Sequence, residues 1–138
     1  MEPSTNLKSF LEALFFVSDD NAELEGYTIF DICENEENRG TLEKISRFLE
    51  SFEEYLVCEH PDLHSAAMDS NRSFGSEVYF SLSGHGVGYW DWSGKEGEQI
   101  QEALERFAKT KYLFEQIYLF EQIYLFAQDG KVWIEGLL

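Results

Sequence analysis

Residues 83–92 read Ser-Gly-His-Gly-Val-Gly-Tyr-Trp-Asp-Trp, and the rest of the chain is organised around this stretch. It contains three of the ten glycines and two of the three tryptophans of the protein. Glycine adopts backbone conformations that other residues disfavour, while Tyr and Trp bury large apolar surfaces. The stretch therefore predicts a tight turn beside an aromatic cluster, in a small sheet.

The segments on both sides of this turn have the character of strands. Residues 77–82 alternate between apolar and polar side chains, and residues 87–92 can return beside them as a hairpin. A second hairpin is predicted near the end of the chain, where Asp129-Gly130 is a strong turn signal before the apolar residues 131–135. The sequence thus predicts about four antiparallel strands.

An internal repeat precedes the second hairpin. Tyr-Leu-Phe-Glu-Gln-Ile occurs at 112–117 and again at 118–123, and Tyr-Leu-Phe begins a third copy at 124–126. A six-residue duplication preserves the two faces of a strand, whereas it turns the faces of a helix by about 240°. We interpret the repeat as an in-frame duplication within a strand or its approach.

Helices are predicted elsewhere from apolar residues at helical spacing. The longer ones run from a cap among Ser4, Thr5 and Asn6 to Ser18, from an N-cap at Thr41 to His60, and from a capping box at 93–96 to Lys109. Short helical turns are expected at 29–33 and 62–68, the first within an ordered acidic loop that spans 22–38. The chain therefore predicts one α+β domain, 1–138, with its N-terminal helices packed on the sheet.

Charge is the outstanding bulk property, because 27 acidic and 10 basic residues give a net charge of −17. Such a field repels nucleic acid and anionic membranes and attracts basic surfaces. Solubility alone is one interpretation of the acidic side chains, but the size of the imbalance favours a basic binding partner. The proposed contact groups are Asp19, Asp20, Glu23, Glu25, Glu34, Glu36, Glu37, Glu50, Glu53 and Glu54.

Metal binding is the weaker interpretation of two clusters. Cys58, His60 and His64 invite comparison with a zinc site, but Pro61 interrupts their spacing and no fourth ligand lies nearby. The acidic residues at 19–25 lack the spacing of a calcium loop. We therefore predict no metal and no cofactor.

Catalysis at the central stretch is an alternative hypothesis. His85 and Asp91 could form an acid–base pair, with Ser81 or Ser83 as a nucleophile, in a small hydrolase or metal-dependent enzyme. The pattern is not a nucleophile elbow, and the alternating glycines do not form a phosphate loop. A further alternative is an accessory module that binds another protein by apolar contact through Tyr89, Trp90 and Trp92.

Residues 80–91, Phe-Ser-Leu-Ser-Gly-His-Gly-Val-Gly-Tyr-Trp-Asp, resemble a phrase found in small acidic proteins of bacteriophages and prophages. The specific part is His85, Gly86, Gly88, Tyr89, Trp90 and Asp91, which Gly84 directly precedes in the wider motif. Tyr89 replaces the usual Phe of that group, the Arg before the Gly-His segment is missing, and the repeat at 112–123 is an addition. The resemblance implies a phage or mobile-element origin and specifies no activity.

Together, charge and resemblance lead to one hypothesis. The protein is expected to be a non-enzymatic inhibitor of a host nucleic-acid-targeting defence system, an anti-CRISPR or anti-restriction protein that acts as an acidic nucleic-acid mimic. Its partner would be the basic surface of a nucleic-acid-binding host protein. With Cys33 and Cys58 too few for a disulfide framework, and with no leader or membrane-spanning run in the sequence, we expect it in the bacterial cytoplasm.

Overall fold

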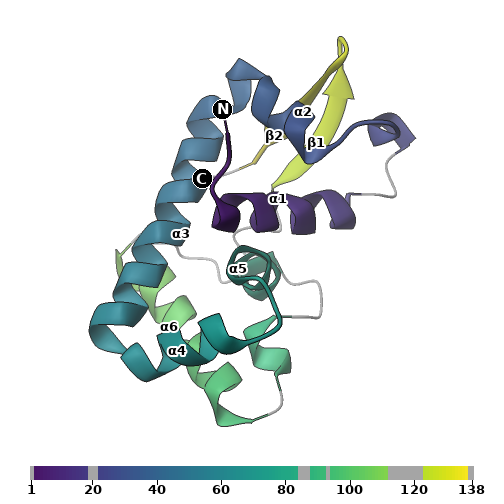
Figure 1. Cartoon of the computed structure of the whole chain (residues 1–138). Helices are drawn as coiled ribbons and strands as arrows, with labels where there is room; N and C mark the ends of the chain where they lie inside the picture. The colour runs from purple at the N-terminus through teal and green to yellow at the C-terminus, as the bar shows by residue number, and fades with distance from the viewer. Residues whose placement is uncertain (1, 19–21, 84–87, 93, 112–122, 137–138) are drawn as a thin grey trace.

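The computed structural model describes residues 2–18, 22–83, 88–92, 94–111 and 123–136, and these residues are mainly helical (Figure 1). The helices are α1 (Thr5–Val17), α2 (Ile29–Glu34), α3 (Arg39–Glu59), α4 (Pro61–Asp69), α5 (Phe74–Ser83) and α6 (Lys95–Lys111). Three short 3-10 turns are η1 (Ala22–Leu24), η2 (Glu36–Asn38) and η3 (Tyr89–Asp91). The sheet consists of β1 (Tyr124–Gln128) and β2 (Lys131–Glu135).

The prediction of about four strands is wrong, because the described residues form one antiparallel pair of strands. Residues 77–82 belong to helix α5, whose buried residues include Phe74, Val78 and Leu82, at spacings of four. Tyr79 and Ser81 are buried as well, so nearly the whole circumference of α5 is covered. In a short helix that is buried on most sides, polar residues such as Ser81 are buried together with apolar ones, so the alternation in residues 77–82 did not mark the two faces of a strand.

The predicted return strand at 87–92 is also wrong within its described residues. The chain forms the turn η3 there, preceded by Gly88 at φ 141°. A Cβ at Gly88 would lie 2.7 Å from Ser81 Oγ and 2.9 Å from the Ser81 backbone nitrogen. Gly88 therefore brings η3 against α5, in a position where a side chain would collide with the helix.

The two long N-terminal helices were predicted correctly. In α1, Ser4 is the N-cap and its hydroxyl accepts a hydrogen bond from the Leu7 N–H at 3.2 Å. Helix α3 ends at Glu59, with His60 as its C-cap residue directly before Pro61, as expected. Its start was placed too late, since Asn38 rather than Thr41 occupies the N-cap position.

Among the described residues, all six helices and both strands contribute buried side chains to one core cluster. Phe52 of α3 stacks on Phe74 with ring centroids 5.8 Å apart and contacts Phe107 of α6 at 5.5 Å. Helix α1 crosses α5 with an edge-to-face contact between Phe10 and Tyr79 at 5.2 Å. At this crossing a Cβ on Gly75 would overlap the Asn6 carbonyl. The backbones of α1 and α5 can therefore come this close only because residue 75 has no side chain.

The C-terminal hairpin was predicted correctly where it is described. β1 and β2 pair from Tyr124 with Glu135 to Gln128 with Lys131. Asp129 and Gly130 both have positive φ, 55° and 72°, as the tight two-residue turn requires. The two complete repeat copies fall largely at 112–122, outside the described residues, and so does Ser93 of the predicted capping box.

Helix α6 confirms another sequence prediction, because Ile100, Leu104 and Phe107 are buried along one face.

Among the described segments, no helix is both long enough and apolar enough to cross a membrane.

Candidate functional site

The predicted contact carboxylates lie on the first half of the chain, and the structure describes all of them except Asp19 and Asp20. Glu53 is partly buried, whereas the other seven are exposed: Glu23, Glu25, Glu34, Glu36, Glu37, Glu50 and Glu54. We call Glu34, Glu36 and Glu37 the α2–η2 acidic cluster, because they lie within four consecutive residues at the junction of these elements.

The α2–η2 acidic cluster lies in a stretch of sequence with one sign of charge, which ends at Arg39, a residue that lines a small pocket together with Glu34 and Glu36. Residues 9–38 include nine acidic residues and no Lys, Arg or His. Glu36 and Glu37 also precede the N-terminus of α3, where the helix dipole stabilises negative charge. The dipole of α3 therefore favours negative charge at Glu36 and Glu37.

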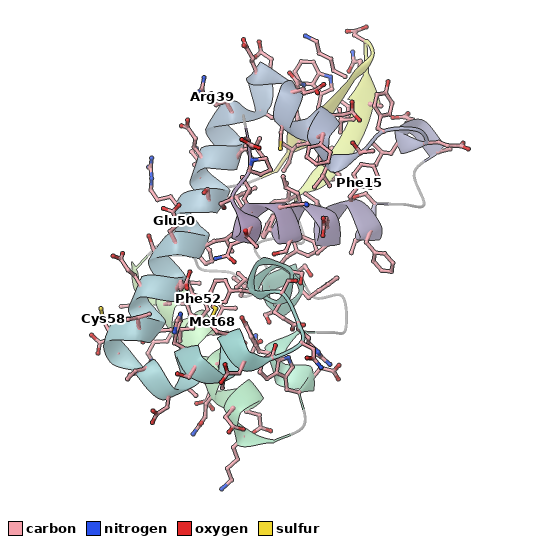
Figure 2. All side chains as sticks on the ribbon, viewed as in Figure 1. Phe15, Arg39, Glu50, Phe52, Cys58 and Met68 are labelled. Atoms are coloured by element: carbon pink, nitrogen blue, oxygen red, sulfur yellow. The ribbon has the colours of Figure 1, made fainter. Side chains whose placement is uncertain are left out.

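The outer side of α3 is different, because both signs of charge alternate along it. Arg39 and Glu50 project from this side in Figure 2. Arg39 Nε lies 3.5 Å from Glu43 Oε1, and Arg47 is exposed between Glu43 and Glu50. Glu50 lies eleven positions after Arg39, about 16 Å along a helix axis. The structure thus sets Glu50 and Glu54 apart from the α2–η2 acidic cluster.

Glu53 is engaged within the chain. Its Oε1 accepts a hydrogen bond from Asn6 Nδ2 of α1 at 3.3 Å, and its Oε2 lies 3.0 Å from His64 Nε2 of α4. The Glu53 and His64 side chains retain 34% and 24% of their exposure. Glu53 therefore ties three helices together, a role that the outward-facing pattern of α3 did not reveal.

The motif at 84–91 is described only in part, since Gly84, His85 and Gly86 lie outside the described residues. The Tyr89 N–H donates to Ser81 Oγ at 2.9 Å, and the Tyr89 ring packs edge-to-face on Trp92 at 5.2 Å. Tyr89 is buried, which raises the pKa of its hydroxyl well above the ordinary value. Asp91 is exposed.

These positions bear on both alternatives drawn from the motif. Ser81 is buried, and its hydroxyl oxygen accepts the hydrogen bond from the Tyr89 N–H. Ser83 is buried as well, and its hydroxyl donates a hydrogen bond to the Phe80 carbonyl at 3.2 Å. Tyr89 faces the interior rather than an outer aromatic surface, whereas Trp92 is half-buried. The described part of the motif packs η3 on α5.

A buried carboxylate that the sequence did not single out lies beside this motif. Glu77 of α5 is 6% exposed, and its oxygens contact Arg72 Nη1 at 3.6 Å and Trp92 Nε1 at 3.4 Å. Burial raises the pKa of Glu77, and Arg72 and Trp92 partly oppose that effect. Its position in the sequence offered one clue, because Glu77 is the only charged residue in the segment that forms α5. Glu77 joins the loop before α5 to η3.

The residues considered for zinc do not converge. Cys58 is exposed on α3, His60 packs against Tyr55 with ring centroids 5.6 Å apart, and His64 faces Glu53. No group of three or more potential ligands occurs among the residues that the structure describes. An open cleft of about 410 Å³ lies nearby between the start of α4 and α6, where Glu59, Asp62, Glu102 and Arg106 contribute mixed charges.

A second, shallow groove of about 390 Å³ lies between the end of α1 and the segment from η1 to α2. Its lining is mostly apolar and includes Phe15, Phe16 and Tyr27, and Glu12 is the one charged residue among the described residues that line it. No motif in the sequence marks this groove.

Comparison of the chain with protein families, with curated proteins and with solved structures finds no match.

Proposed function

We propose that the protein inhibits a host nucleic-acid-targeting defence complex by presenting carboxylates to a basic surface that otherwise holds DNA or RNA. The observation that carries this proposal is the exposed α2–η2 acidic cluster within a segment that has no basic residue between positions 9 and 38. Glu23 and Glu25 add exposed charge of the same sign.

Carboxylates can replace phosphates because both accept charge-assisted hydrogen bonds from Arg and Lys. A nucleic-acid groove is surrounded by counterions when it is empty, and binding of any polyanion releases them. A protein with a net charge of −17 can therefore compete for such a groove while being repelled by nucleic acid itself.

The resemblance of residues 80–91 to small acidic phage proteins supports a bacterial host as the setting. Phages face restriction enzymes and CRISPR effectors, and both classes bind DNA or RNA through basic grooves. The proposed partner is accordingly the nucleic-acid groove of one of these complexes in the bacterial cytoplasm.

The test is DNA cleavage by a panel of purified restriction enzymes and CRISPR effectors, assayed with increasing amounts of the protein. Inhibition of at least one complex is expected, competitive with DNA and weaker at higher salt. Indifference of every complex, or inhibition that does not change with salt, would overturn the proposal.

A pair of charge-reversal variants separates the α2–η2 acidic cluster from net charge. Glu36→Lys with Glu37→Lys alters the cluster, and Glu98→Lys with Glu102→Lys makes the same change in charge near the start of α6, also at exposed positions. Since a hydrogen bond to a charged group contributes about 1.5–3 kcal/mol, the first variant should inhibit at least about 10-fold less well. The second should stay within about 2-fold of the unmodified protein, because its charges act only at long range.

A further inference from the structure

The groove at the end of α1 combines an apolar floor with one of the most exposed aromatic side chains in the described residues. It is lined by Glu12, Phe15, Phe16, Tyr27, Thr28 and Ile29. Phe16 is 74% exposed, although Leu14, two residues earlier on α1, and Ile29, which lines the same groove, are buried. A contiguous apolar surface that borders a concave site is a feature of binding sites, and Phe15, Phe16 and Tyr27 form such a surface here.

The wall of the groove opposite α1 is fixed by local hydrogen bonds. Gly26 has φ 86°, which turns the chain after η1 so that Tyr27 and Thr28 return beside α1. The Thr28 N–H donates to Asp31 Oδ2 at 2.7 Å, and Thr28 Oγ1 accepts from the Phe30 N–H at 3.3 Å. This capping box at the start of α2 holds the wall in place before any partner binds.

Charge around the groove selects its occupant. Glu12 lies one helical turn before Phe16, and the last turn of α1 contains no basic residue to offset the negative end of the helix dipole. A second copy of this chain would bring another net charge of −17 to the contact, and anionic membranes and nucleic acids would be repelled as well. The complementary occupant is a basic segment of a different protein.

We propose that this groove docks a basic segment of the partner protein, with one aromatic or aliphatic side chain seated on Phe16 and Tyr27 and with Arg or Lys beside Glu12. This inference rests on the proposed function for the sign of the partner's charge and adds the apolar anchor. Buried aromatic anchors typically dominate interface energies, while exposed rim charges mainly set orientation and association rate.

The test uses synthetic peptides as probes and isotope-labelled protein observed by NMR. The first peptide carries Leu-Phe between pairs of Arg and Lys. The second keeps the basic residues and replaces Leu-Phe by Ser-Ser, and the third keeps Leu-Phe and replaces the basic residues by Glu. Binding of the first peptide alone is expected, with shifts at Phe16, Tyr27 and Ile29.

Two alanine variants locate the anchor. Phe16→Ala should weaken binding of the first peptide about 10-fold or more, as loss of an aromatic hot spot does. Phe30→Ala is the matched control, because Phe30 is 54% exposed but does not line the groove. Both side chains are mostly exposed, so unfolding temperatures should stay near that of the unmodified protein.

Several outcomes would overturn the inference. The first is that no peptide binds. The second is that the first peptide binds no better than the second or the third. The third is that Phe16→Ala and Phe30→Ala weaken binding of the first peptide equally. Dimerisation lost in Phe16→Ala, measured by analytical ultracentrifugation, would assign the groove to a second copy. None of these results changes the cleavage assay with the Glu36 and Glu37 variants, so failure of the groove and failure of the proposed function are distinguishable.

Discussion

The side chain of Asn38 accepts a hydrogen bond from the Ile134 backbone N–H at 3.1 Å, across 96 positions of sequence. Its amide nitrogen also donates to the Val132 carbonyl at 2.9 Å, and Asn35 Nδ2 donates to the same oxygen at 3.0 Å. In an antiparallel ladder, the N–H and C=O groups of Val132 and Ile134 that do not face β1 form an open edge. Buried side-chain amides close that edge in place of a third strand.

Replacing Asn38 should therefore destabilise the protein strongly. Asn38→Ala leaves the Ile134 N–H buried without its acceptor, and an unsatisfied buried group costs about 1–3 kcal/mol. We expect a loss of about 2 kcal/mol or more in the free energy of unfolding, measured by urea denaturation. Asn71→Ala, at an exposed loop position, should change it by less than about 0.5 kcal/mol. Similar values for both variants would contradict the edge-closing role.

Gly75 should tolerate no side chain. A Cβ there would overlap the Asn6 carbonyl and come 2.9 Å from the Asn6 carbonyl carbon, so Gly75→Ala must push α1 away from α5. Overpacking of this kind costs about 1–3 kcal/mol. Gly40 provides the matched control, because it also lies in a helix but its Cβ would meet nothing within 4 Å. Gly40→Ala should stabilise the protein by about 0.5–1 kcal/mol, and the opposite order of the two variants would refute the packing argument.

Much of the fold followed from the sequence where a signal was long or chemically specific. Helices α1, α3 and α6 repeat their apolar pattern over three or more turns, and Asp129-Gly130 is a turn signal with few alternatives. Helix α5 failed because ten residues that are buried on most sides carry no distinguishing period. The start of α3 was predicted too late for a physical reason as well. The Asn38 side chain is hydrogen-bonded to β2 and makes no cap hydrogen bond, so it does not act as an ordinary capping residue.

The candidate site was less predictable, because most of it depends on contacts between distant segments. Exposure of the α2–η2 acidic cluster is expected for ionised groups. By contrast, the engagement of Glu53 depends on Asn6 and His64, which lie on other helices. The groove beside Phe16 forms only when the chain returns at Tyr27, so neither half of it is recognisable alone.

The two thiols should react at very different rates. Cys58 is exposed, whereas Cys33 is buried and its burial raises the thiol pKa, which lowers the fraction of reactive thiolate. Ellman's reagent should therefore titrate one thiol in the native protein and both in denaturant. Cys58→Ser should remove the rapid reaction and Cys33→Ser the one seen only after unfolding. Two rapid thiols in the native state would show that Cys33 is accessible.

Glu77 should make the stability of the protein depend on pH in the direction opposite to that of a paired surface carboxylate. Burial raises the pKa of Glu77 in the folded state above the ordinary value of 4.5, so the folded protein binds its proton more tightly than the unfolded chain. Stability then falls as the pH rises between these two pKa values. The free-energy cost of burying ionised Glu77 is complete above the folded-state pKa and disappears below the pKa of the unfolded chain.

Glu77→Gln isolates this effect, because the amide oxygen can still accept a hydrogen bond from Trp92 Nε1 without carrying charge. The variant should be more stable than the unmodified protein at pH 7, and the difference should shrink towards zero as the pH falls to 4. Urea unfolding at pH 7, 5.5 and 4 measures this difference, with Glu98→Gln as the exposed control on α6. A variant that is less stable at pH 7 would mean that attraction between Arg72 and ionised Glu77 outweighs the cost of burying the charge.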